Sequence, residues 1–337
     1  MKYVFIAHSH TLVLCSLGTI NYLNLPHEDC LFLATRNYKM PKGLTDVRVV
    51  DANKWHDFFS RTNCTYKERR QQIKQFDEDL GKWTNKDNIK VFIPHLMNIM
   101  FYLMATYSKS KEVMYVQEGA FTAKYCFYNH HSLFRKIRGY LSSIIRYRTL
   151  RMYPCYGWYT DGSLWFQNKI KVYCLNKDFF QYMPQDKIVL NIIKWPECKE
   201  DIKLKNPKAP IFVFDAFVKN GLIDKDIYYD CCKRLINENY GHFNYLKFHP
   251  GQSQEERLYI ISIFEDMGKQ WETFTEDIPF EFFISKLKDL KIVGFGSSLL
   301  YFAHYCGHNV IAHSSWLLQS PLFAKYVEQG YPIFDKQ

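Results

Sequence analysis

The feature that most constrains the fold of this chain is an alternation of short apolar runs with longer helix-like stretches, which occurs twice. In the first half, strands are expected at residues 2–7, 30–35, 47–50, 91–94 and 113–116, and helices at 11–22, 67–80 and 95–107. In the second half, strands are expected at residues 211–214, 245–248, 291–293 and 309–312, and helices at 226–239 and 255–267. Strands that alternate with helices predict parallel sheets, so the fold class is α/β.

A charged, proline-punctuated stretch at residues 196–210 separates the halves and is the expected linker. The length of 337 residues agrees with two domains, because one hydrophobic core rarely supports so long a chain. We expect one Rossmann-like domain at 1–196 and a second at 208–314. A helical segment is expected at 315–337, and packing back on the first domain is one option for it.

Polar residues follow several predicted strands directly. The sequence QEG follows the strand at 113–116, HP follows the strand at 245–248, and GFGSS at 294–298 follows the strand at 291–293. Ligands of parallel sheets bind beyond the carboxyl ends of the strands, so these segments are candidate site residues.

These segments also carry a family resemblance. YVQEG at 115–119, KFHP at 247–250 and GFGSS at 294–298 resemble, in order and spacing, the acidic-Gly, His-Pro and Ser-Ser motifs of bacterial sialyltransferases and polysialyltransferases of the GT-B class. IPFE at 278–281 resembles the segment that precedes the Ser-Ser motif. The resemblance implies a GT-B fold, with two Rossmann-like domains whose parallel sheets face a central cleft. It also implies that the domain at 1–196 is on the acceptor side and carries the general base, and that the domain at 208–314 binds CMP. It also implies inverting transfer of sialic acid from CMP-sialic acid to a glycan, with no metal ion or other cofactor.

Glu118 is the candidate general base. A carboxylate on the turn after a strand can take the proton of an attacking sugar hydroxyl. The family usually has two acidic residues before this glycine, and here the first is Gln117. The alternative is that Glu118 is a solvated turn residue. Asp161, in the run TDGS, is a reserve base, although such a run is also a plain turn signature.

His249 is the candidate group for the departing phosphate. Proline holds the preceding residue extended, which aims the imidazole from the strand end. The resemblance implies that His249 stabilises or protonates the phosphate of CMP, a task that suits a group titrating near neutral pH. A structural histidine is the alternative.

The start of the helix after residue 296 is expected to bind phosphate through backbone N–H groups and serine hydroxyls. The resemblance implies that the acidic residue of IPFE holds the ribose hydroxyls. Ordinary helix capping is the alternative for the serines, and an acidic helix start for the glutamate. The expected CMP-binding residues are Lys247, His249, Pro250, Gly296, Ser297, Ser298 and Glu281.

Other polar residues at strand ends are candidates for the donor or acceptor side, with a polar turn or helix cap as the alternative. These are His8, Ser9 and His10 after the first strand, and Asp215 after the strand at 211–214. A zinc site is not expected, because the histidines and cysteine at 304–313 lack a standard ligand spacing.

The net charge of +10 favours anionic partners. Residues 133–150 are basic and amphipathic, which suits an anionic leaflet, a groove for an acidic glycan, or an ordinary helix with a charged outer face. Ten cysteines without regular spacing indicate reduced thiols, hence a cytoplasmic protein, with peripheral contact to the inner membrane face as an option. Within the first 23 residues the apolar run is short and is interrupted by His8, Ser9 and His10, so neither a bilayer span nor a leader is expected there.

The expected partners are therefore CMP-sialic acid and a glycan or glycolipid acceptor, such as a galactose-terminated lipooligosaccharide or capsule. No nucleic-acid motif accompanies the basic charge, so no nucleic acid is expected. Two alternatives stay open, namely a GT-B transferase with a different nucleotide-sugar donor and a catalytically inactive glycan-binding protein.

Overall fold

The chain divides into two compact units, Met1–Cys198 and Lys199–Gln337, in the computed structural model. The structure describes residues 1–41, 44–60, 63–96, 98–118, 128–129, 133–149, 151, 159–160, 171–175, 187–190, 204–274, 279–328, 331 and 333–336. Asp161 and most of the expected linker lie outside the described residues.

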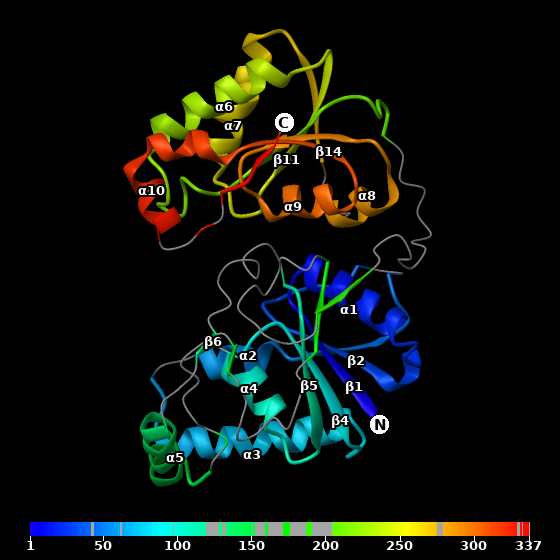
Figure 1. Ribbon diagram of the computed structural model, residues 1–337, viewed down its shortest axis with the longest axis vertical. Coiled ribbons are helices and arrows are strands. Elements are labelled where there is room, and N and C mark those ends of the chain that lie inside the picture. The colour runs from blue at the N-terminus through cyan, green and yellow to red at the C-terminus, as the bar shows by residue number, and fades with distance from the viewer. Residues whose placement is uncertain are drawn as a thin grey trace. The chain divides into compact units, whose positions relative to one another are not determined.

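The first unit is built on a sheet with the strand order β3-β2-β1-β4-β5-β8-β9, in which all neighbouring strands are parallel (Figure 1). Its strands are β1 Lys2–Ala7, β2 Cys30–Ala34, β3 Arg48–Asp51, β4 Ile89–Ile93, β5 Ser110–Val116, β8 Val172–Cys174 and β9 Lys187–Val189. Its α-helices are α1 His10–Tyr22, α2 Asn53–Ser60, α3 Tyr66–Trp83, α4 Ile99–Ala105 and α5 Leu133–Tyr147. A short 3-10 helix, η1 His27–Asp29, precedes β2, and the short strands β6 Tyr128–Asn129 and β7 Tyr159–Thr160 pair with each other.

The central strands of this sheet are apolar along their length because helices cover both faces of a parallel sheet. The rings of Phe5, Phe32 and Phe92 on β1, β2 and β4 are buried and pack side by side, with centroids 5.6 Å and 4.2 Å from that of Phe5. Helix α3 begins at a capping box, in which Thr65 and Glu68 satisfy each other's backbone N–H groups.

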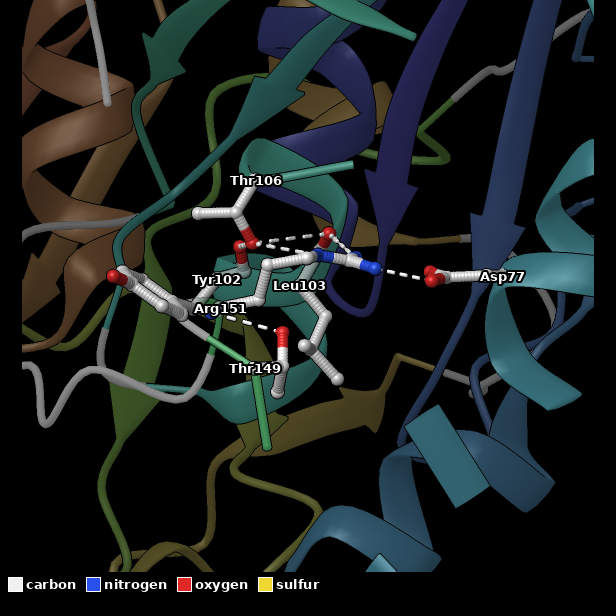
Figure 2. Close-up of polar contacts among 6 residues, drawn as sticks. All are labelled: Asp77, Tyr102, Leu103, Thr106, Thr149 and Arg151. Atoms are coloured by element: carbon white, nitrogen blue, oxygen red, sulfur yellow. Dashed lines mark hydrogen bonds and ion pairs between the residues drawn. The ribbon is translucent and has the colours of Figure 1, made fainter. Parts of the chain in front are cut away.

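Arg151 joins α3 to α4 (Figure 2). Its guanidinium pairs with the carboxylate of Asp77 on α3, and its Nη2 donates to the carbonyl oxygen of Leu103 on α4 at 2.6 Å. Nε lies 3.3 Å from the hydroxyl of Thr106, at the carboxyl end of α4. Burial raises the pKa of Asp77, and the hydrogen bond and charge of Arg151 partly offset that rise. The arginine therefore compensates a carboxylate that is largely buried.

The second unit repeats the pattern with the strand order β12-β11-β10-β13-β14-β15 (Figure 1). Its strands are β10 Ile211–Phe214, β11 Phe243–Phe248, β12 Gln270–Thr273, β13 Lys291–Gly294, β14 Asn309–His313 and β15 Asp335–Lys336. All neighbours are parallel except β15, which runs antiparallel to β14. Its helices are α6 Lys225–Asn239, α7 Gln254–Asp266, α8 Phe280–Lys286, α9 Ser298–Tyr305, η5 Ser314–Gln319 and α10 Pro321–Glu328.

Gly294 allows the two central strands of this sheet to lie close together. A Cβ atom at this position would lie 2.7 Å from the carbonyl oxygen of Val213 and 3.0 Å from the side chain of Leu300. A side chain there would force β13 away from β10, so glycine is required by close approach.

The segment expected to be helical at 315–337 includes η5 and α10, which belong to the second unit. Leu317 on η5 and Phe323 on α10 are fully buried within the core of the second unit, and the Tyr331 hydroxyl donates to the carbonyl oxygen of Gly296 at 2.7 Å. This end of the chain completes the second unit because its apolar side chains fill that core.

The prediction of an α/β fold with two Rossmann-like units is confirmed. In each unit the first five strands adopt the order 3-2-1-4-5 of the doubly wound fold. The predicted start of the helix at 95–107 was wrong. The helix expected at 95–107 begins at Ile99, because the Asn98 side chain accepts a hydrogen bond from Met100 N and caps it, which leaves His95 on the preceding loop. Across the described ranges, no helix combines the length and the apolar composition that a membrane crossing requires.

Candidate functional site

In the first unit, four polar side chains lie where four neighbouring strands end. Arg36 follows β2, His8 follows β1, His95 follows β4 and Glu118 follows β5. The strands β2, β1, β4 and β5 are adjacent in the sheet, and β1 and β4 form the switch point at which the strand order reverses. Open α/β sheets bind ligands at this point, so the fold places these side chains where a ligand site is expected.

Glu118 is the centre of this cluster. Its Oε1 lies 2.6 Å from His8 Nε2 and 3.1 Å from Arg36 Nη1, and its Oε2 lies 3.6 Å from His95 Nε2. The His8 side chain is fully buried, whereas the Glu118 side chain keeps 22% of its surface exposed. Part of the Glu118 side chain is therefore accessible even though its carboxylate contacts three neighbouring groups.

The cluster also sets the protonation of its members. Burial by itself would raise the pKa of Glu118, but the hydrogen bond from His8 and the charges of His8, His95 and Arg36 outweigh burial and lower the pKa to about 2. Burial lowers the pKa of His95 to about 4, and the charge of Glu118 only partly opposes that fall. At neutral pH the site thus holds an ionised carboxylate beside a neutral His95.

Gln117 stands where the resembling family usually has an acidic residue, and it has a structural role. Its side chain is buried, and its Oε1 accepts a hydrogen bond from Leu175 N at 2.8 Å, just beyond the end of β8. Glu118, and not residue 117, is the side chain within the histidine cluster. The solvated-turn alternative for Glu118 does not fit, because its carboxylate is engaged by three cationic or imidazole groups.

Ser9 and His10, the other two candidates after the first strand, contact different parts of the first unit. Ser9 is the N-cap of α1, accepting from Leu12 N, and its hydroxyl lies 3.5 Å from the backbone oxygen of Glu118. His10 Nδ1 lies 2.8 Å from the Tyr38 hydroxyl. Ser9 therefore borders the cluster, while His10 contacts a tyrosine from the loop after β2.

His95 and Arg36 are site residues that the sequence analysis missed. The helix expected at 95–107 includes His95, and Arg36 belongs to none of the motifs. Both directly follow predicted strands, so the strand-end rule that selected His8 would have found them.

In the second unit, His249 lies on a tightly held turn after β11. Its backbone N–H donates to Gln252 Oε1 at 2.9 Å, and the Arg257 side chain donates to the carbonyl oxygens of His249 and Pro250. His249 as a whole is exposed, although neighbouring atoms cover part of its ring. Partial burial, with the charges of Lys247 and Arg257, lowers the pKa of His249.

The backbone defines the tautomer of this histidine. Gly251 N donates to His249 Nδ1 at 2.9 Å, and because an amide can only donate, Nδ1 carries no proton. The proton of the neutral ring then lies on Nε2. His249 can therefore present an N–H donor to an anion, whereas protonating the leaving group would first require breaking the bond from Gly251.

Asp215 and Ser297 meet at the switch point of the second sheet, where β10 and β13 end. The Ser297 side chain and the Gly296 backbone hydrogen-bond the Asp215 carboxylate, which is only 6% exposed. Burial raises the pKa of Asp215 to about 7 in spite of these two hydrogen bonds. Within the described residues, Asp215 Oδ2 has no hydrogen-bond partner.

The Ser297 hydroxyl is thus already committed, since it also accepts from Leu299 N at 3.4 Å as the N-cap of α9. Ser298, the first residue of α9, is exposed. The two serines therefore differ: Ser297 anchors the buried carboxylate, and Ser298 can reach a ligand.

The other expected nucleotide-binding residues surround these two positions. Lys247 is half-buried near the end of β11, and Pro250 is exposed on the turn that follows. Glu281 is half-buried in the first turn of α8, which packs against α9.

The histidines near the carboxyl end do not make a metal site. His308 Nδ1 accepts from Leu290 N at 3.3 Å and its Nε2 lies 2.8 Å from the carbonyl oxygen of Ile284, so both ring nitrogens hold the second unit together. In the part of the chain that the structure describes, no three His, Cys, Asp or Glu side chains are grouped to hold a metal ion.

Comparisons with known proteins give remote likenesses only. No family model and no curated protein matches the sequence. Among solved structures, MnaA of S. aureus, determined with UDP, is 12% identical over 98% of this chain and 82% of that chain, with a TM-score of 0.47. ADP-heptose lps heptosyltransferase II of E. coli is 13% identical over 93% of this chain and 84% of that chain (TM-score 0.40). MurG of Acinetobacter baumannii is 8% identical over 98% and 90% (TM-score 0.39). Likenesses this remote carry no inference about donor or reaction.

Proposed function

We propose that this chain is a glycosyltransferase of the GT-B class, and specifically an inverting sialyltransferase that transfers sialic acid from CMP-sialic acid to a glycan. One observation carries the proposal. The three segments that resemble sialyltransferase motifs begin in the last residues of the strands β5, β11 and β13, at the carboxyl ends where parallel sheets bind ligands. Motif order along the chain and position in the fold therefore agree.

In this proposal Glu118 accepts the proton of the acceptor hydroxyl. His8 and Arg36 engage Oε1, so we assign the incoming proton to Oε2. A carboxylate with a pKa of about 2 is a weak base, and it takes the proton only as the attacking oxygen becomes positively charged. Such late proton transfer suits the oxocarbenium-like transition state that the family resemblance implies. Attack from the face opposite CMP inverts the anomeric centre.

His249 stabilises the phosphate of departing CMP in this proposal. Its Nε2–H donates to a phosphate oxygen, and the exposed Ser298 with the backbone N–H groups at the start of α9 supplies further donors. Ser297 acts indirectly by anchoring Asp215. We assign Glu281 to the ribose hydroxyls, and we propose that no metal ion takes part.

We further propose that the acceptor is a galactose-terminated glycan, such as a lipooligosaccharide or capsule chain, and that transfer takes place in the cytoplasm. The net charge of +10 supports this choice, since both the donor and such acceptors are anionic.

Release of CMP from CMP-sialic acid in EDTA, with and without a galactose-terminated acceptor, tests the proposal. Glu118→Gln is expected to lower the acceptor-dependent rate by about 10²–10⁴-fold, the range for loss of a general base. His249→Ala is expected to lower it by about 10²-fold or more, as for loss of a donor to developing negative charge. Glu238→Gln and His242→Ala, at exposed positions of the second unit, make the same kinds of substitution outside both clusters; they are the controls and should retain the wild-type rate.

The other outcomes identify the alternatives. Release of UDP, ADP or TDP from the corresponding sugar nucleotides, and none from CMP-sialic acid, would show a transferase with another donor. Glycan binding without turnover of any donor would show a binding protein. Activity that is lost in EDTA and restored by a divalent cation would overturn metal independence.

A further inference from the structure

Helix α5 presents its apolar side chains to solvent. Four of them, at positions 134, 137, 141 and 145, recur at intervals of three or four residues, and position 144 lies three residues after 141, which places all five on one stripe of the helix. The exposed fractions are 74% for Phe134, 51% for Ile137, 55% for Leu141, 47% for Ile144 and 77% for Ile145. Isolated exposed apolar residues are ordinary, but five on one helix form a patch that calls for an explanation.

The opposite face of α5 is the one that packs on the protein. Gly139 and Ser143 are buried, and the Ser143 hydroxyl donates to the carbonyl oxygen of Thr149. Tyr147 packs edge-on against Tyr66, the first residue of α3, with ring centroids 5.4 Å apart, and Figure 1 shows α5 beside one end of α3. A helix that served only the core of this unit would turn its apolar stripe inward. Here small and polar residues face inward, so the apolar stripe is left for another surface.

The charges on α5 identify that surface. The helix contains no Asp or Glu, and the exposed residues Arg138 and Arg146, with Arg148 just beyond the helix, give it positive charge. An apolar stripe bordered by arginines is the pattern of helices that lie in the interface of a membrane, where the apolar side chains enter the acyl region and the cations meet anionic headgroups. A second copy of the chain would instead bring arginines against arginines.

We propose that α5 is an interfacial helix that attaches this protein to an anionic lipid surface, through the stripe formed by Phe134, Ile137, Leu141, Ile144 and Ile145. The attachment does not depend on the proposed transferase activity, because none of these residues belongs to the clusters around Glu118 or His249. A membrane-linked acceptor would gain from it, since enzyme and acceptor would then share one surface.

Sedimentation with lipid vesicles tests the proposal without an activity assay. The full chain is expected to sediment with vesicles of phosphatidylcholine and phosphatidylglycerol, and far less with phosphatidylcholine alone. Ile145→Ser and Leu141→Ser are each expected to weaken the partition coefficient by about tenfold, the scale of one buried aliphatic side chain. Leu258→Ser is the matched control, because Leu258 on α7 is equally exposed, at 57%, but lies in the other unit.

A second pair of variants separates charge from apolar insertion. Arg138→Gln with Arg148→Gln is expected to weaken binding to the phosphatidylglycerol vesicles, and added salt is expected to do the same. Circular dichroism of each variant checks that the fold is retained.

Three results would overturn the proposal: no binding of the wild-type chain to anionic vesicles, equal loss in Leu258→Ser, or binding that the α5 variants leave unchanged. Light scattering that shows a dimer dissociated by Ile145→Ser, together with no vesicle binding, would assign the stripe to a second copy of the chain.

Discussion

Replacement of Asp215 by Asn should change how the stability of the second unit depends on pH. The carboxyl group is almost fully buried beside Ser297 and Gly296, and burial raises its pKa from 3.8 to about 7. Asparagine has nearly the same shape and can still accept from Ser297, but it does not titrate. The substitution therefore removes a buried ionisation with little change in packing.

The sign and size follow from the two pKa values. Between pH 3.8 and about pH 7 the folded protein keeps a proton on Asp215 that the unfolded chain has lost, so the free energy of unfolding falls as pH rises through this window. The stabilising effect of the proton is complete below pH 3.8 and is lost above about pH 7. At about 1.4 kcal/mol per pKa unit, the full loss is about 4 kcal/mol, of which about 3 kcal/mol falls between pH 5 and pH 8.

Urea unfolding of the wild type and of Asp215→Asn at several pH values between 5 and 8 measures this effect. The free energy of unfolding of the variant should rise by about 3 kcal/mol relative to that of the wild type between pH 5 and pH 8. The new amide N–H groups add a difference that is the same at every pH and does not affect this change. Asp226→Asn, at an exposed position on α6, is the control and should stay within about 0.5 kcal/mol of a constant difference. A difference between wild type and Asp215→Asn that does not vary with pH would refute the raised pKa.

Three further predictions concern the other clusters. Arg36→Gln removes one of the charges that lower the pKa of Glu118, so this pKa should rise. The acidic limb of the pH–rate profile for CMP release should then move to higher pH. An acidic limb that does not move would count against Glu118 as the base. In denaturant unfolding, Gly294→Ala should destabilise the second unit by about 1–3 kcal/mol through overpacking. Gly18→Ala, within α1, should instead stabilise the first unit by about 0.5–1 kcal/mol, because the new methyl group makes only ordinary van der Waals contact with Leu190 and alanine favours the helix. Arg151→Met leaves the largely buried carboxylate of Asp77 without its partner and should lower the free energy of unfolding of the first unit by about 3 kcal/mol. A loss below about 0.5 kcal/mol would mean that the ion pair of Arg151 with Asp77 does not stabilise the unit.

The central strands and most helices could be predicted from the sequence because their signals are local. The strand at 211–214 and the first strand at 2–7 have the predicted bounds, since each contains a short apolar run that ends directly before a polar residue, Asp215 or His8. The short strands β8 and β9 and the helix α2 were missed, because three strand residues or eight helical residues carry too little periodicity to stand out.

The candidate site was only partly predictable, for a different physical reason. Glu118, His8, His249 and Asp215 could be selected because each follows a strand, a feature that is written in the order of residues. The tautomer of His249, by contrast, depends on where the N–H group of Gly251 lies in space.

By itself, the sequence determined the α/β class, the division into two Rossmann-like units and the strand ends at which polar side chains gather, because these follow from the spacing of apolar residues along the chain. Only the tertiary structure decided that His95 and Arg36 join Glu118, that Ser297 holds Asp215, and that the apolar stripe of α5 faces outward. Those features depend on which strands lie side by side and which helix face meets the core, and both are set by packing between residues far apart in the chain.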